Sequence, residues 1–152
     1  MTFVHHATLI ALGMVVGSCV GSFLNVCVYR VPRGRSVLNP PSSCPCCGSS
    51  IRARDNVPVL GWIFLGGACR DCGGRISIRY PLIELATGLL FATVYLAHLA
   101  AETGDMLERC GPWLVGFRVV VEPLLILTPI AAVWMRAEAR TPGVCNPNAK
   151  PR

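Results

Sequence analysis

The feature that most constrains this chain is an uncharged, mostly apolar stretch from Ala7 to Tyr29. At a helical rise of 1.5 Å per residue, these 23 positions reach roughly 35 Å, which is enough to cross the hydrocarbon core of a bilayer with some tilt. A secretory signal peptide would carry Lys or Arg before a shorter apolar stretch, and residues 1–6 contain neither. We therefore predict a retained transmembrane helix at 7–29.

Two further apolar stretches predict a second span at 80–101 and a third at 113–135. The third contains Arg118 and Glu122, whose i, i+4 spacing puts them on one face where they can pair. Charged residues make up 14% of the chain, against about 25% in soluble domains. We therefore expect a mainly α, polytopic membrane protein with about three transmembrane helices and a small irregular loop domain.

Glycines recur at every fourth position of the first span, at Gly13, Gly17 and Gly21, and Asn25 extends this row. Such a row forms a smooth helix face that another helix backbone can approach closely. Because Asn25 is polar, we expect it to face protein and to hydrogen-bond across a helix interface. Helix packing is favoured over a catalytic role for this residue.

The polar stretch 30–79 is rich in proline and glycine, which excludes a long helix, and it is too small to fold without a metal or disulfide staple. It holds eight arginines, whereas Arg109 is the only basic residue between the second and third spans. The positive-inside rule places 30–79 and the tail 136–152 in the cytoplasm, and residues 1–6 and 102–112 in the periplasm. The tail, rich in proline and asparagine, is predicted to be disordered.

Nine cysteines would suggest a disulfide scaffold in a small secreted chain, but a cytoplasmic loop is kept reduced. Four of them form two C-x-x-C turns, each followed by glycine, with 21 residues between the turns. This pattern predicts a tetrahedral Zn²⁺ site, and four protein ligands make it structural because no position remains for a catalytic water. A pair of redox dithiols is the less favoured alternative. The predicted ligands are Cys44, Cys47, Cys69 and Cys72.

Cys46 could replace Cys47 as a ligand, although the spacing favours Cys47. The apolar piece Val57–Leu65 is expected to form strands or turns. The negative charge of four thiolates around Zn²⁺ could be offset by nearby arginines, at positions 52, 54, 70 and 75. The remaining cysteines have no metal role assigned: those in the first span act as small apolar residues, and two others have no assigned partner (Cys19 and Cys27; Cys110 and Cys145).

The sequence lacks the motifs of common soluble nucleotide-binding proteins and zinc proteases. It contains no G-x-x-x-x-G-K-[ST], G-x-G-x-x-G or H-E-x-x-H motif. His98 is interpreted as interfacial. The arginines follow the ends of apolar segments instead of forming a stripe with aromatic residues, which argues against a nucleic-acid partner. Membrane lipid is the partner that the composition predicts.

Several ordered motifs between about Gly13 and Phe91 resemble the N-terminal region of the type IV prepilin peptidases. They are Gly21–Gly34, Cys44–Cys47, Asp55–Trp62, Cys69–Cys72 and Ile76–Glu84. The resemblance implies a bacterial inner-membrane enzyme that cleaves the leaders of type IV prepilins and type II secretion pseudopilins. Many members then methylate the new N-terminus with S-adenosylmethionine, and the resemblance associates the region matched here with that second step.

The peptidase half of this resemblance is not found. The family cleaves with two aspartates on later helices, one of them in a Gly-x-Gly-Asp motif. The only aspartate after the second span is Asp105, which follows Glu-Thr-Gly and falls in the predicted periplasmic loop. The catalytic residues are therefore unassigned.

Two hypotheses follow from this resemblance. The chain is the N-terminal region of a prepilin leader peptidase/N-methyltransferase, or it is a non-catalytic, zinc-stapled membrane module or truncated fragment. Arg79 and Glu84, at the cytoplasmic edge of the second span, either bind substrate or anchor the interface and cap the helix, and the second role is favoured.

Overall fold

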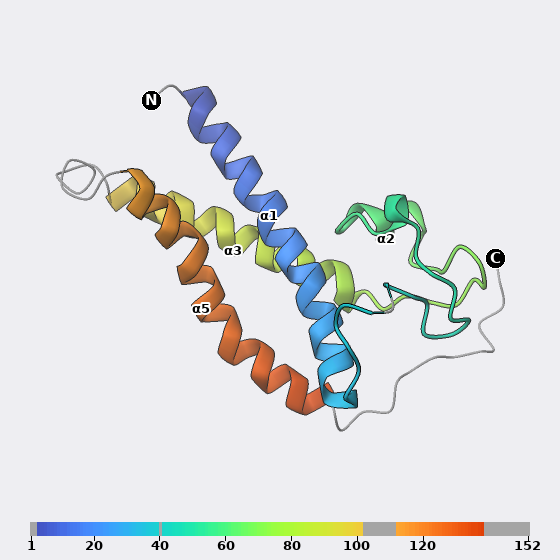
Figure 1. Cartoon of the computed structure of the whole chain (residues 1–152). Coiled ribbons are helices and arrows are strands. Elements are labelled where there is room, and N and C mark those ends of the chain that lie inside the picture. Colours follow the sequence, from blue (N-terminus) through green and yellow to red (C-terminus); the bar gives the residue numbers. More distant parts are fainter. Residues whose placement is uncertain (1–2, 40, 102–111, 139–152) are drawn as a thin grey trace.

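The computed structural model describes residues 3–39, 41–101 and 112–138, and these ranges contain helices and loops but no β-strand. Figure 1 shows the long helices packed together and the loop region that carries the short helix. The helices are α1 (Phe3–Arg30), α2 (Leu60–Phe64), α3 (Arg79–Ala101) and α5 (Pro112–Glu138), with 3-10 turns η1 (Val31–Arg33) and η2 (Ala53–Asp55). The predicted mainly α fold is confirmed.

Three helical segments are long and apolar enough to cross a membrane: Val4–Arg33, which joins α1 to η1, Arg79–Leu99 of α3 and Phe117–Ala137 of α5. The prediction of about three spans is therefore confirmed. The first helix begins earlier than predicted because no proline or glycine interrupts residues 3–6. The predicted loop 102–112, except for its last residue, and most of the predicted tail 136–152 lie outside the described residues.

Helices α1 and α3 cross closely because glycines of both helices lie at their contact (Figure 1). A Cβ atom added at Gly17 would lie 2.6 Å from the Thr87 carbonyl oxygen, and one added at Gly88 would lie 2.6 Å from Ser18 Oγ. Gly21 also has no room for a side chain, because it faces Thr87 Oγ1. The predicted glycine face of the first helix is thus confirmed as a packing surface.

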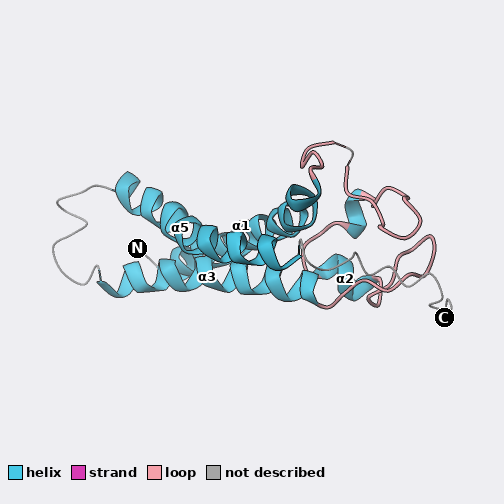
Figure 2. Cartoon of the chain, turned by 90° about the horizontal axis from the view of Figure 1, so that it is seen from below, coloured by secondary structure: helices cyan, strands magenta, loops and turns pink. Residues whose placement is uncertain are grey.

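Helix α5 returns from the C-terminal end of α3 toward the C-terminal end of α1, where it contacts η1 (Figure 1). The end of α1, the start of α3 and the end of α5 therefore lie on the side of the bundle that carries the loop region, as Figure 2 also shows. This arrangement agrees with the alternation of spans that the sequence predicts.

Two charged residues in the middle of α5, Arg118 and Glu122, have partners. Glu122 Oε1 lies 3.8 Å from Arg118 Nε, which confirms the predicted pair within one helix face. Glu122 Oε2 lies 2.9 Å from His98 Nε2 of α3. His98, interpreted as interfacial from the sequence, therefore also links α3 to α5.

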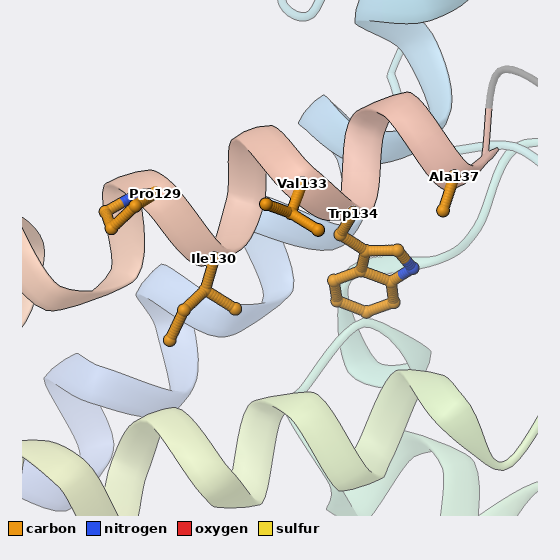
Figure 3. A pocket seen from close by; sticks show the side chains of 5 residues that line it. All are labelled: Pro129, Ile130, Val133, Trp134 and Ala137. Atoms are coloured by element: carbon orange, nitrogen blue, oxygen red, sulfur yellow. The ribbon is translucent and has the colours of Figure 1, made fainter.

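A shallow groove runs along the C-terminal half of α5, and Figure 3 shows its lining side chains. They are all apolar or aromatic: Pro129, Ile130, Val133, Trp134 and Ala137. The lining offers no carboxylate, thiol or imidazole, and the groove belongs to a membrane span. Such a surface suits lipid or another helix rather than chemistry.

Candidate metal centre

The first C-x-x-C turn is closed by backbone hydrogen bonds. The Gly48 N–H donates to the Cys44 carbonyl at 2.9 Å, and the Cys44 N–H donates to the Ser49 carbonyl at 2.9 Å. Gly48 has a φ of +74°, in the left-handed region that favours glycine. An isolated antiparallel bridge between Ser43 and Ser50 closes the base of the turn.

The second turn repeats this geometry 25 positions later. The Gly73 N–H donates to the Cys69 carbonyl at 2.9 Å, and the Cys69 N–H donates to the Gly74 carbonyl at 2.8 Å. Gly73 has a φ of +68°, and a bridge between Ala68 and Arg75 matches the one in the first turn. The glycine after each C-x-x-C is thus required by the fold of the turn itself.

The two turns face each other and bring four sulfur atoms together. All four Sγ atoms, those of Cys44, Cys47, Cys69 and Cys72, lie within 4.8 Å of one another. The pairs that bridge the turns are 3.8 Å apart for Cys44–Cys72 and 4.0 Å apart for Cys47–Cys69. Tetrahedral Zn²⁺ with Zn–S bonds of about 2.3 Å requires sulfur atoms about 3.8 Å apart. The donor set and its spacing therefore fit a closed, four-thiolate site for a divalent metal.

Backbone N–H groups near the sulfurs favour negative charge there. The Cys46 N–H donates to Cys44 Sγ, and the Gly74 N–H donates to Cys72 Sγ, each at 3.4 Å. A Cβ at Gly74 would lie 3.2 Å from Cys72 Sγ and 3.0 Å from Cys46 Sγ, so only glycine fits comfortably beside this ligand. The amide donors stabilise the thiolate form that a metal requires.

Thiols this close resist joint ionisation, because each negative charge raises the pKa of its neighbours. The side chain and backbone N–H of Ser49 lower the pKa of Cys47 to about 6. At Cys72, the Gly74 N–H lowers the pKa, but the neighbouring thiols and burial outweigh it and raise the pKa to about 12. Burial raises the pKa of Cys44. A bound cation is what would bring all four sulfurs to the thiolate form.

The structure separates the ligand candidates from the other cysteines. Cys47, and not Cys46, belongs to the group of four sulfurs. Cys19 and Cys27 lie in α1, away from this group. The two cysteines at positions 110 and 145 lie outside the described residues.

Two ion pairs hold the second turn against the segment before α2. Arg70 donates from Nε and Nη2 to the two carboxylate oxygens of Asp55 at 2.8 and 2.6 Å. Arg52 Nη2 lies 3.4 Å from Asp71 Oδ1. The hydrogen bonds from Arg70, helped by its charge, lower the pKa of Asp55. The sequence suggests that nearby arginines offset the charge of the thiolates; two of these arginines, Arg52 and Arg70, pair with carboxylates.

Trp62 ties the middle of the loop to the second turn. Its indole Nε1 donates to the Ile76 carbonyl at 3.0 Å, and its ring covers Gly67, where a Cβ would lie 2.7 Å from the ring. Residues 60–64 form the short helix α2, so the expectation of strands or turns over Val57–Leu65 was wrong for most of this piece. Because Gly61 has no side chain, α2 can pack directly on the Asp55 carbonyl.

Two buried polar side chains of α1 bind backbone carbonyls of other segments. Asn25 Nδ2 donates to the Tyr80 carbonyl of α3 at 3.2 Å, which confirms its predicted hydrogen bond across a helix interface. Arg30, at the end of α1, donates to the carbonyls of Ser36 and Pro41 at 3.0 and 3.1 Å. Both side chains act structurally in this arrangement.

Glu84 has a role that sequence reasoning missed. It is 8% exposed, and its Oε2 accepts a 2.7 Å hydrogen bond from the Val59 N–H. Val59 has φ +62° and ψ −53°, and the Leu60 N–H donates to the Pro58 carbonyl at 2.6 Å, so Val59 is the centre of a strained γ-turn. Glu84 therefore holds the entry to α2. The sequence suggested instead that it caps its own helix.

Comparison with known proteins places these features in a family context. A family model described as the bacterial peptidase A24 N-terminal domain matches residues 15–98, which include all four clustered cysteines. The chain is 54% identical over 77 residues to a prepilin leader peptidase/N-methyltransferase of Myxococcus xanthus, an alignment that covers 51% of this chain and 23% of that protein. No solved structure matches the chain.

Two longer alignments extend the similarity. A prepilin leader peptidase/N-methyltransferase of Klebsiella pneumoniae is 43% identical over 122 residues, covering 76% of this chain and 49% of that protein. A type 4 prepilin-like proteins leader peptide-processing enzyme of Escherichia coli is 36% identical over 132 residues, covering 75% and 49%. The chain thus spans between about a quarter and about half of the length of these relatives.

Proposed function

The chain belongs to the family of bacterial peptidase A24 N-terminal domains, and on this premise we propose that it acts in the processing of type IV prepilins and type II secretion pseudopilins at the bacterial inner membrane. The names of its relatives support prepilins as the substrate class. Three helices that can cross a membrane support the location, and the excess of arginine in residues 30–79 supports a cytoplasmic position for the loop region.

We further propose that Cys44, Cys47, Cys69 and Cys72 bind one structural Zn²⁺. The observation that carries this proposal is the convergence of four sulfurs within 4.8 Å from two turns of the same geometry. When bound, Zn²⁺ supplies a cross-link between the turns. The residues themselves do the rest: backbone amides stabilise the thiolates, and the Arg70–Asp55 pair fixes the second turn against the segment before α2.

Of the two activities named for the relatives, we propose that this chain contributes to N-terminal methylation with S-adenosylmethionine as donor. The chain contains three aspartates, Asp55, Asp71 and Asp105. Asp55 and Asp71 are engaged in ion pairs of the loop region, and Asp105 lies outside the described residues. The sequence therefore offers no pair of aspartates on later helices, and we assign no leader cleavage to this chain alone.

Metal analysis of the purified protein tests the zinc site. We expect one equivalent of zinc per chain under reducing conditions, and its loss in Cys69→Ser. Cys19→Ser is the control, because Cys19 is a free cysteine of α1 and lies outside the group of four sulfurs. Retention of zinc in Cys69→Ser, or equal losses in both variants, would contradict the assigned ligand set.

Methyl transfer tests the activity. The protein in phospholipid vesicles would be given labelled S-adenosylmethionine and a mature pilin with a free N-terminus. We expect label on the pilin N-terminus with wild type and Cys19→Ser, and none with Cys69→Ser. An absence of transfer by the zinc-loaded protein would favour the alternative of a non-catalytic membrane module, and cleavage of an unprocessed prepilin would show that our view of the aspartates is wrong.

A further inference from the structure

The short helix α2 presents an apolar face that the rest of the described structure leaves uncovered. Leu60, Ile63 and Phe64 are 48%, 56% and 78% exposed, and their i, i+3, i+4 spacing puts them on one side of the helix. The other side is used for packing: Gly61 lies on the Asp55 carbonyl, and Trp62 donates to the Ile76 carbonyl. The exposed face is therefore a separate surface and not part of the loop's own core.

The position of α2 along the bundle is fixed by a membrane helix. The Val59 N–H, directly before α2, donates to the buried carboxylate of Glu84 at 2.7 Å. Glu84 lies five positions after Arg79, where the membrane-spanning segment of α3 begins. Figures 1 and 2 both place α2 beside this end of α3. The contact holds α2 at the depth at which α3 would enter the bilayer.

Exposed basic side chains lie on the two elements that hold α2 in place. Arg54 belongs to η2, which contacts α2, and Arg79 begins α3; both are exposed. The residues next to Arg79 continue the apolar character, since Ile78 and Leu82 are 51% and 55% exposed. An exposed apolar helix face with exposed arginines on the elements next to it is typical of structures that lie in the membrane surface.

We propose that the α2 face binds the surface of the same bilayer that the three long helices cross. Leu60, Ile63 and Phe64 enter the boundary between headgroups and acyl chains, and Arg54 and Arg79 of the neighbouring elements lie among lipid phosphates. The γ-turn at Val59 and its hydrogen bond to Glu84 set the direction in which α2 leaves the bundle. The loop that carries the four cysteines is thereby held flat against the membrane at two places, through α3 and through α2.

Photocrosslinking of the full chain in vesicles tests this proposal. The photoreactive residue p-benzoylphenylalanine would replace Phe64, and in a control protein it would replace Ser50, an exposed residue beside the first cysteine turn. After reconstitution into phosphatidylethanolamine and phosphatidylglycerol and illumination, intact-protein mass spectrometry reports the adducts. We expect phospholipid adducts at position 64 at about ten times the yield at position 50, because an interfacial face is buried about 5–10 Å into the headgroup and acyl boundary.

The nature of the adduct decides between occupants. A crosslinked dimer, or equal lipid yields at both positions, would overturn the proposal. Replacement of phosphatidylglycerol by phosphatidylcholine should lower the yield at position 64, because the arginines lose their anionic partners. Zinc content equal to that of wild type would show that both labelled proteins keep the folded loop.

Discussion

Replacing Gly17 by alanine should weaken the packing of α1 on α3, whereas the same change at Gly13 should not. A Cβ at Gly17 would lie 2.6 Å from the Thr87 carbonyl oxygen and 2.9 Å from Gly88 Cα, but one at Gly13 would meet only the Phe91 carbonyl oxygen at 4.0 Å. To restore an ordinary contact of 3.4 Å at Gly17, the helices must separate by about 0.8 Å, the difference between 3.4 and 2.6 Å. The obstructing atoms belong to the backbone, so no side-chain rotation relieves the clash.

Overpacking of this kind costs about 1–3 kcal/mol. Both variants gain the same helix propensity, about 0.8–1.0 kcal/mol per glycine replaced in a helix interior, so comparing them isolates the clash. We therefore expect the Gly17→Ala protein to be less stable than the Gly13→Ala protein by about 1–3 kcal/mol. At about 1.4 kcal/mol per tenfold change, this corresponds to a roughly 5- to 150-fold shift in the unfolding equilibrium.

The assay is reversible unfolding of the purified protein in dodecyl maltoside micelles with increasing sodium dodecyl sulfate, followed by circular dichroism. Stability is extrapolated linearly from each transition, which requires that the slopes agree between variants. Equal stability of the two alanine variants would refute the argument that α1 and α3 meet at Gly17 with backbone contact. Greater stability of the Gly17→Ala protein would refute it more directly.

Two further predictions concern the loop region. Trp62→Phe removes the donor to the Ile76 carbonyl. Because the lost hydrogen bond contributes about 1 kcal/mol or slightly more, amide hydrogen exchange in residues 66–76 should become faster by about tenfold. Unchanged exchange would contradict this role of Trp62. The pKa of Asp55 is lowered in the folded state by Arg70, so the pair stabilises the loop at neutral pH and this contribution is lost as the pH falls below about 3.9. Asp55→Asn should therefore flatten the acid-induced change of tryptophan fluorescence, and a profile identical to wild type would count against the pair.

The membrane helices and the cysteine ligands could be predicted because both are local properties of the sequence. A span is set by length and apolarity, and a metal turn by the spacing of Cys44 and Cys47 and the glycine after them. Asn25 could also be placed, because a polar residue in line with Gly17 and Gly21 has to find a partner between helices. These predictions required no knowledge of which distant segments meet.

The attachment of the loop could not be predicted, because it depends on contacts between distant segments. Glu84 lies 25 positions from Val59, and nothing in the spacing of the two connects them. A valine with positive φ is contrary to the preference of β-branched residues, so the turn at Val59 cannot be read from propensity. The sequence around Glu84 shows only that it lies near the end of its own helix, so a role in capping that helix is what the sequence predicts.

Because the chain is synthesised from its N-terminus, the position of the second cysteine turn before α3 affects how the later helices insert into the membrane. Cys72, the last of the four clustered cysteines, precedes Arg79 by seven positions, so the complete donor set leaves the ribosome before α3 does. A loop that folds at this stage becomes a bulky knot on one side of the bilayer while only α1 is available for insertion. Translocating such a knot is far harder than translocating an extended chain, so early folding would fix the orientation of every helix that follows.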